Sequence, residues 1–154
     1  MSFREKLSWG VLLTTSALWS FYFVRLGLKA ADGLLTQNMV VWTLAGCGVV
    51  GAALQIGLAI LTSVKTSKAE RAVVDEHEQG MELRASQAAF LTMAFVLGGL
   101  ATFAYFQALR HPELLGAEAF APAMLLAANG VLFALVLAEI VRHATLITLL
   151  RRVG

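Results

Sequence analysis

Four apolar stretches, each long enough to cross a lipid bilayer, constrain this chain more than any other feature. They cover approximately residues 7–28, 39–64, 85–109 and 123–141. A transmembrane helix needs about 20 largely apolar residues, and the connections between the stretches are too short to fold alone. The sequence therefore predicts an all-α integral membrane four-helix bundle, with residues 1–154 forming a single transmembrane domain.

The overall composition excludes an ordinary soluble domain. Hydrophobic residues make up 58% of the chain and charged residues 14%, and the mean hydropathy is +0.74, whereas soluble domains carry about 25% charged residues. The net charge is +2, but the basic residues gather at the ends of the stretches and not in a patch with interleaved aromatics. We therefore expect no direct binding of nucleic acid. Cys47 is the only cysteine, which excludes an intrachain disulfide and a cysteine cluster.

The first stretch follows Arg4, Glu5 and Lys6, which resemble the charged start of a signal peptide. No small-residue cleavage site follows the apolar run, so we expect an uncleaved first helix. Asp32 and Gly33 give the turn signal after it.

A charged run separates the two apolar halves. Asp75 and Glu78 have the spacing of a variant capping box, in which Asp75 accepts from first-turn amides and Glu78 reaches back. The third helix is therefore expected to begin outside the membrane. The run, residues 65–84, holds nine of the 22 formal charges: Lys65, Lys68, Glu70, Arg71, Asp75, Glu76, Glu78, Glu82 and Arg84.

The basic residues also predict the orientation of the chain. If both termini and residues 65–84 face the cytoplasm, that side carries nine of the 12 basic residues. The other side then carries only Arg25, Lys29 and Arg110. We expect a multi-pass protein of the bacterial inner (cell) membrane. By the positive-inside rule, we expect both of its termini to face the cytoplasm.

Small residues in the second stretch allow close packing of helices. Gly48 and Ala52 form one small-xxx-small pair, and Ala53 and Gly57 form another. Such pairs let helix backbones approach closely in lipid. We expect them to pack inside this chain and not to form a dedicated dimer face.

No catalytic, metal or cofactor site emerges from the sequence. The chain has no HExxH or EF-hand pattern and no recognisable nucleophile–base set, so we expect no enzyme and no cofactor. His111 and His143 are predicted on opposite membrane sides, too far apart to share one haem. A divalent cation could in principle bind the following residues, although a solvated helix start already explains them: Asp75, Glu76, His77, Glu78 and Glu82.

Three polar residues fall within or near the apolar stretches, namely Gln55, Asn129 and Glu139. An ionisable group at membrane depth is a functional hypothesis by default, such as a proton or ion relay. The structural alternative is interhelical hydrogen bonding for Gln55 and Asn129. Glu139 has local partners at i+3 and i+4, Arg142 and His143.

Three segments of the chain carry a family resemblance: MSFREK (1–6), DEHEQGMELRA (75–85) and ALVLAEIVR (134–142), with Arg151 and Arg152 after them. They resemble a family of small four-helix bacterial inner-membrane proteins that has no assigned function. In that family the middle segment reads Asp-Glu-Arg-Asp/Glu-x-x-Ile-Glu-x-Arg; here His77 replaces the arginine and Met81 the isoleucine, so no role of that arginine carries over. The relatives are often encoded beside small helix-turn-helix regulators, which implies a transcription regulator as partner.

These observations lead to one main functional hypothesis and two alternatives. The main hypothesis is a non-enzymatic membrane protein that offers its charged cytoplasmic segment to a soluble regulator protein. The alternatives are a homo-oligomeric transport or channel subunit that uses Gln55, Asn129 and Glu139, and an accessory subunit of a larger membrane complex. The predicted partner-binding residues are Asp75, Glu76, His77, Glu78, Glu82 and Arg84.

Overall fold

The described residues of the chain fold into four long helices. The structure, a computed structural model, describes residues 3–64, 76–111 and 117–153. The helices are α1 (Phe3–Ala31), α2 (Gln37–Val64), α4 (Glu76–Arg110) and α5 (Ala117–Val153), and all four are long and apolar enough to cross a membrane. The predicted all-α, four-helix membrane architecture is therefore confirmed.

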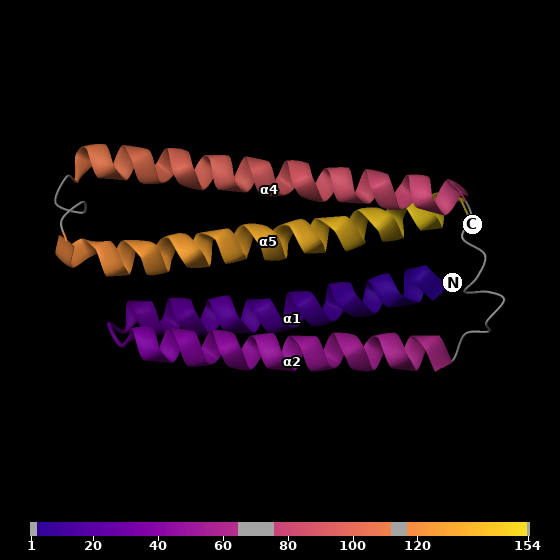
Figure 1. Cartoon of the computed structure of the whole chain (residues 1–154), viewed down its shortest axis with the longest axis horizontal. Coiled ribbons are helices and arrows are strands. Elements are labelled where there is room, and N and C mark those ends of the chain that lie inside the picture. Colours follow the sequence, from indigo (N-terminus) through magenta and orange to yellow (C-terminus); the bar gives the residue numbers. More distant parts are fainter. Residues whose placement is uncertain (1–2, 65–75, 112–116, 154) are drawn as a thin grey trace.

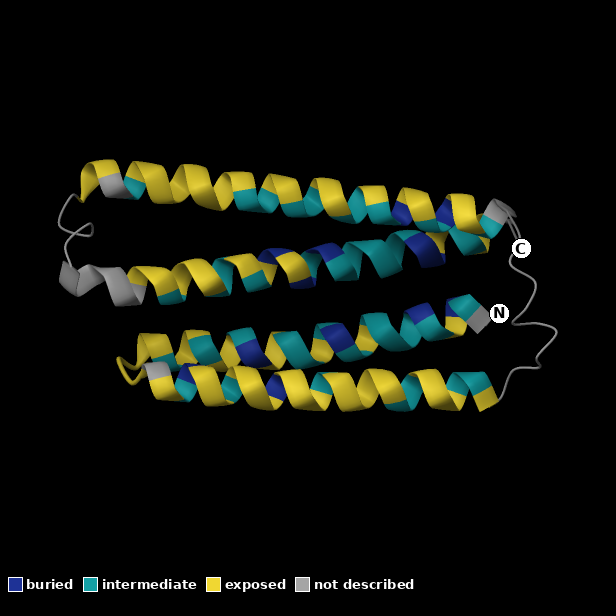
Figure 2. Cartoon of the chain, in the orientation of Figure 1, coloured by how far each residue is buried: buried dark blue, intermediate teal, exposed yellow. Residues whose placement is uncertain are grey.

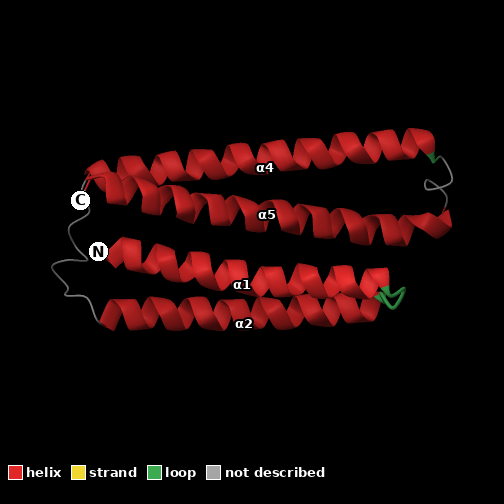
Figure 3. Cartoon of the chain, turned by 180° about the vertical axis from the view of Figure 1, so that it is seen from behind, coloured by secondary structure: helices red, strands yellow, loops and turns green. Residues whose placement is uncertain are grey.

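The helices lie side by side in the order α2, α1, α5, α4 (Figure 1). The view from behind shows the same order (Figure 3). Helix α1 packs against both α2 and α5, while α4 packs against α5. Helices α1 and α4 begin, and α2 and α5 finish, at the same end of the bundle, where both chain termini lie. We call this end the polar end. Helices α2 and α4 therefore form the two edges of the bundle.

The helices extend beyond the predicted apolar stretches because the charged residues at their ends remain helical. The largest difference concerns α5, for which the predicted apolar stretch runs from about residue 123 to about residue 141. In the structure, α5 begins at Ala117 and continues as one helix to Val153. Leu146 of this last part is buried against Met81 and Ala85 of α4, and this apolar packing holds the C-terminal turns in the bundle.

The predicted turn between the first two helices is present. Gly33 has a φ of 68°, in the left-handed region that favours glycine, and the amide of Asp32 donates to the carbonyl of Leu28. The Thr36 hydroxyl accepts from the amide of Met39 at 3.3 Å, which satisfies an otherwise free donor of the first turn of α2. The two helices are thus joined tightly at the end opposite the polar end.

Much of the apolar surface faces outward, as a bilayer requires. Figure 2 shows exposed residues along the outer faces of every helix. Trp42 is 72% and Phe95 84% exposed, which would be costly in water but places these rings against lipid. Apolar burial therefore says little about which helices are neighbours in this protein.

Glycines do bring α1 and α2 together, but not the predicted ones. A Cβ atom added to Gly10 would collide with Leu58, and one added to Gly51 would lie 2.9 Å from Leu18. By contrast, a Cβ at Gly48 or Gly57 meets nothing within 4 Å. The expectation that the Gly48 and Gly57 pairs pack inside this chain is therefore wrong.

Candidate functional site

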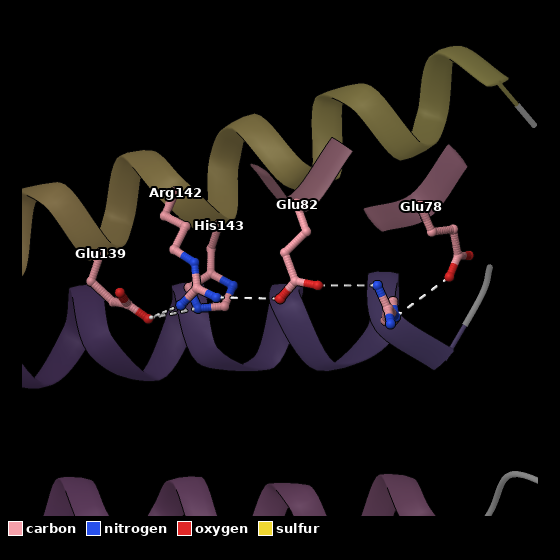
Figure 4. Close-up of polar contacts among 6 residues, drawn as sticks. Glu78, Glu82, Glu139, Arg142 and His143 are labelled. Atoms are coloured by element: carbon pink, nitrogen blue, oxygen red, sulfur yellow. Dashed lines mark hydrogen bonds and ion pairs between the residues drawn. The ribbon is translucent and has the colours of Figure 1, made fainter. Parts of the chain in front are cut away.

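Charged side chains from three helices meet at the polar end and form one continuous series of contacts (Figure 4). Glu82 of α4 lies between an arginine of α1 and an arginine of α5, and Glu78 of α4 contacts the same arginine of α1. The series continues along α5 through a second glutamate to a histidine. We call this set the charge ladder, and in order it consists of Glu78, Arg4, Glu82, Arg142, Glu139 and His143.

Glu82 is the branch point of the ladder. One of its carboxylate oxygens accepts from Arg4 Nη1 at 3.2 Å, and the other accepts from Arg142 Nη2 at 3.4 Å. The Glu82 side chain is 43% exposed, so the pairs are partly solvated and each is worth at most about 1 kcal/mol. Glu82 nevertheless ties both α1 and α5 to the start of α4.

Glu78 completes the α4 end of the ladder. Its carboxylate lies 3.4 Å from Arg4 Nε. The capping box predicted for this carboxylate includes Asp75, which lies outside the described residues. The Arg4 side chain is only 28% exposed and lies between Glu78 and Glu82, so it joins the start of α4 to α1.

The α5 end of the ladder enters the apolar part of that helix. Glu139 Oε1 lies 2.9 Å from His143 Nε2 and 3.5 Å from Arg142 Nη1. These are the two local partners expected from the i+3 and i+4 spacing. The His143 side chain is 12% exposed, and its Nδ1 atom is buried without a hydrogen-bond partner among the described residues.

A second polar link joins α1 and α5 at the polar end. Arg151 Nε donates to Glu5 Oε1 at 2.9 Å, and the Arg151 guanidinium lies 5.3 Å from the centre of the Trp9 ring. Glu5 is 8% exposed, whereas the Arg151 side chain is 58% exposed, so the carboxylate of this pair is buried and the guanidinium lies at the surface. Together, the two sets fix the first turns of α1 and α4 against the last turns of α5.

The side of α4 that faces away from the ladder is open. Gln79, Leu83, Arg84 and Gln87 are exposed there. A shallow hollow of about 440 Å³ lies on this face, lined by Leu83, Ser86, Gln87, Phe90 and Leu91. We call these five residues and Gln79 and Arg84 the outer face of α4.

The structure divides the predicted partner-binding residues between the two sides of α4. Glu78 and Glu82 form ion pairs within the chain, while Arg84 is exposed. Asp75 lies outside the described residues. Glu76 and His77 belong to α4, but the placement of their side chains is not described.

Asn129 makes the interhelical hydrogen bond expected of it. The Tyr22 hydroxyl donates to Asn129 Oδ1 at 2.6 Å, and Asn129 Nδ2 donates to the carbonyl of Leu125 at 2.8 Å. Gln55 differs: it is exposed on α2, so the expected hydrogen bond to another helix does not form within the described part of the chain.

Sequence reasoning missed a buried polar stripe on α1. Glu5, Ser8 and Thr15 are at most 8% exposed, and Tyr22 is fully buried. Ser8, Thr15 and Tyr22 are seven residues apart, which places them on one helix face, and Glu5 and Tyr22 contact α5. The heptad spacing of hydroxyl residues within an apolar stretch was the available signal.

The described residues offer no metal centre. No three histidine, cysteine, aspartate or glutamate side chains among them are grouped closely enough to hold a metal ion. The ladder therefore consists of ion pairs and hydrogen bonds. No protein-family model, curated protein or solved structure matches the chain.

Proposed function

We propose that this chain is a non-enzymatic bacterial inner-membrane protein that holds a soluble regulatory protein at the outer face of α4. The observation that carries the proposal is the contrast between the two sides of the first turns of α4. Glu78 and Glu82 are engaged by α1 and α5, whereas Leu83, Arg84 and Gln87 remain exposed.

The ladder supports docking because it holds the start of α4 in one position. Association costs free energy for every segment that must become ordered on binding. A helix end already fixed by Arg4 and Arg142 avoids much of that cost. The charged segment predicted from the sequence thus contributes in two ways, with the inward glutamates positioning the helix and the outward residues contacting the partner.

The composition of the outer face indicates the kind of partner. Arg84 provides a positive charge, Gln79 and Gln87 provide hydrogen-bonding groups, and Leu83 is 62% exposed. Phe90 lies further along α4, inside the predicted apolar stretch, and faces lipid. A complementary partner offers an acidic group beside an apolar patch. A small transcription regulator, the partner implied by the family resemblance, is the candidate we favour.

The proposed orientation places the polar end in the cytoplasm. Arg4, Lys6, Arg84, Arg142 and Arg151 belong to the nine basic residues assigned to that side, and basic residues near helix ends favour the cytoplasmic side. A cytoplasmic regulator would then reach the outer face of α4.

The test is co-purification of the tagged protein in mild detergent, with variants that separate the two sides of α4. Arg84→Glu combined with Gln87→Ala should reduce recovery of the regulator at least fivefold, without changing membrane insertion or stability. Lys6→Glu is the matched control, because Lys6 is also exposed at the polar end but lies on α1. Equal recovery by the native protein and the Arg84/Gln87 variant would overturn the proposal.

A transport or channel subunit is the second candidate, and the buried polar stripe of α1 favours it. Glu5 and Tyr22 bond to α5, and Ser8 and Thr15 are buried on α1 between them. Glu139 adds an ionisable group within the apolar part of the protein. Glu139→Gln should then change ion or proton flux in liposomes. If liposomes with the native protein show the same flux as empty vesicles, this candidate is excluded.

An accessory subunit of a larger complex is the third candidate. Among the described helices, α2 has an extensive contact with α1 only. Three small residues of α2 are exposed: Gly48, Ala52 and Ala53. Extraction of the native protein with other membrane chains attached would favour this candidate over a self-contained docking protein.

A further inference from the structure

A groove between α1 and α2 opens on the side of the bundle near the end opposite the polar end. It has a volume of about 470 Å³, and its walls include the apolar side chains Leu18, Phe21 and Val50. Because both helices are candidate membrane spans, the groove opens toward the lipid. Its volume and its apolar walls suit an acyl chain.

An arginine lies at one end of this groove. Arg25 lines the groove and is exposed, with its guanidinium 6.0 Å from the centre of the Phe21 ring. The arginines that form ion pairs in the described residues all lie at the polar end: Arg4, Arg142 and Arg151. Arg25 has no ion-pair partner among the described residues, so it is available to an anion from outside the chain.

The position of Arg25 along α1 matches the depth of a lipid phosphate. No charged residue occurs between Lys6 and Arg25, and the intervening 18 residues span about 27 Å at 1.5 Å per residue. This is close to the thickness of the hydrocarbon core, about 30 Å. When Lys6 lies at one membrane surface, Arg25 therefore lies at the other.

Two further lining residues fit the same depth. Trp42 lies in the groove and is 72% exposed, and tryptophan favours the level of the lipid headgroups. Thr43 also lines the groove and adds a hydroxyl, although that hydroxyl already donates to the carbonyl of Met39 at 2.7 Å. The headgroup end of the groove is thus amphipathic, while Leu18 and Val50 line its apolar part.

We propose that this groove binds one anionic phospholipid, with the phosphate at Arg25 and an acyl chain between α1 and α2. The Arg25 guanidinium, which has no ion-pair partner within the described parts of the chain, provides the charge complementarity, and the lipid-facing apolar walls accommodate the acyl chain. The proposal does not depend on which leaflet contains this end of the protein, nor on the function proposed for the outer face of α4.

The test uses the purified full chain in mild detergent, mixed with equimolar phosphatidylglycerol and phosphatidylcholine, with bound lipid counted by native mass spectrometry. A basic side chain near a membrane surface contributes about 1 kcal/mol toward anionic lipid, which corresponds to about a fivefold preference. We therefore expect the first retained lipid to be phosphatidylglycerol about five times as often as phosphatidylcholine. Arg25→Gln should reduce the preference to near one, and Arg25→Lys should keep most of it.

Arg110→Gln is the matched charge control. Arg110 is exposed at the same end of the bundle, but on α4, away from the groove. This variant should keep the preference of the native protein. Loss of the preference in both variants would show that it reflects general charge at this end, and an unchanged preference in Arg25→Gln would equally overturn the proposal.

A second pair of variants tests the groove itself. Gly46 lines the groove, and a Cβ there meets nothing within 4 Å, so Gly46→Leu should fill the space without disturbing helix packing. Retention of the first lipid should fall at least threefold. Gly48→Leu adds the same side chain to α2 outside the lining residues and should retain lipid as the native protein does. Equal retention by the two variants would exclude the groove as the binding site.

Discussion

The two contacts that α1 makes are built from opposite kinds of residue. Toward α5 it presents polar groups, with Glu5 bonded to Arg151 and Tyr22 bonded to Asn129. Toward α2 it relies on small residues, with Gly10 against Leu58 and, in the other direction, Leu18 against Gly51. One helix therefore uses two different means of helix association within the same membrane.

The difference shows what each kind of contact can specify in a bilayer. Lipid tails are as apolar as leucine, so apolar burial gives little driving force between helices. Glycine lets helix backbones approach closely and increases dispersion contacts. It does not by itself specify which helix becomes the partner. Polar pairs select both the partner helix and its vertical position, because an unpaired polar group in hydrocarbon is costly.

The largest expected effect comes from filling the close approach of α1 and α2. Gly10→Leu should lower the free energy of unfolding by about 2 kcal/mol, since overpacking a tight contact costs about 1–3 kcal/mol. Unfolding by SDS in mixed micelles, followed by circular dichroism, measures this. Adding Leu58→Ala to Gly10→Leu should recover part of the loss because it restores space. Strict additivity of the two substitutions would show that the glycine contact is unimportant.

Removing the branch point of the ladder should have the next largest effect. In Glu82→Gln, the side chain no longer carries the charge that pairs with Arg4 and Arg142. Because these pairs are partly exposed, we expect a loss of about 1 kcal/mol, and one that shrinks as salt is added. Asp32→Asn is the control, since Asp32 is an exposed acid at the opposite end. A loss of the same size in both variants would argue against a specific ladder.

The interhelical hydrogen bond of Tyr22 should contribute less. Tyr22→Phe keeps the ring contacts with Trp19 and Phe23 but removes the donor to Asn129. Measured hydrogen bonds between membrane helices average about 0.6 kcal/mol, and we expect a loss of that size. Asn129→Ala in the Tyr22→Phe background should add little further loss if the two groups act as a pair. A large additional loss would mean that Asn129 has another role.

The sequence predicted the number and approximate limits of the helices because the apolar stretches are long and sharply bounded. The predicted fourth apolar stretch ends near residue 141, because Glu139, Arg142 and His143 interrupt the apolar run there. In the structure, these residues pair with one another and with Glu82. The apolar residues beyond them, such as Leu146, pack on α4.

Local pairing was predictable, whereas long-range pairing was not. The contacts of Glu139 with its i+3 and i+4 neighbours follow from helix geometry alone. The contact of Arg4 with Glu82 joins residues 78 positions apart and depends on the order of the helices around α5, which no local pattern specifies. The same reason explains why Gly48 was expected to pack inside the chain and Gly10 was overlooked.

The smallest expected effect is that of Gly48→Leu. A side chain at Gly48 meets nothing within 4 Å, and Ala52, its small neighbour one turn along, is exposed. If only Gly10 and Gly51 mediate the contact of α1 and α2, the unfolding free energy of the isolated chain should change by less than about 0.5 kcal/mol. SDS unfolding at several protein concentrations checks this, because a loss confined to high concentration would reveal a contact between copies. A large loss at every concentration would instead show that Gly48 packs within the chain, and the distinction between the two sets of glycines would fail.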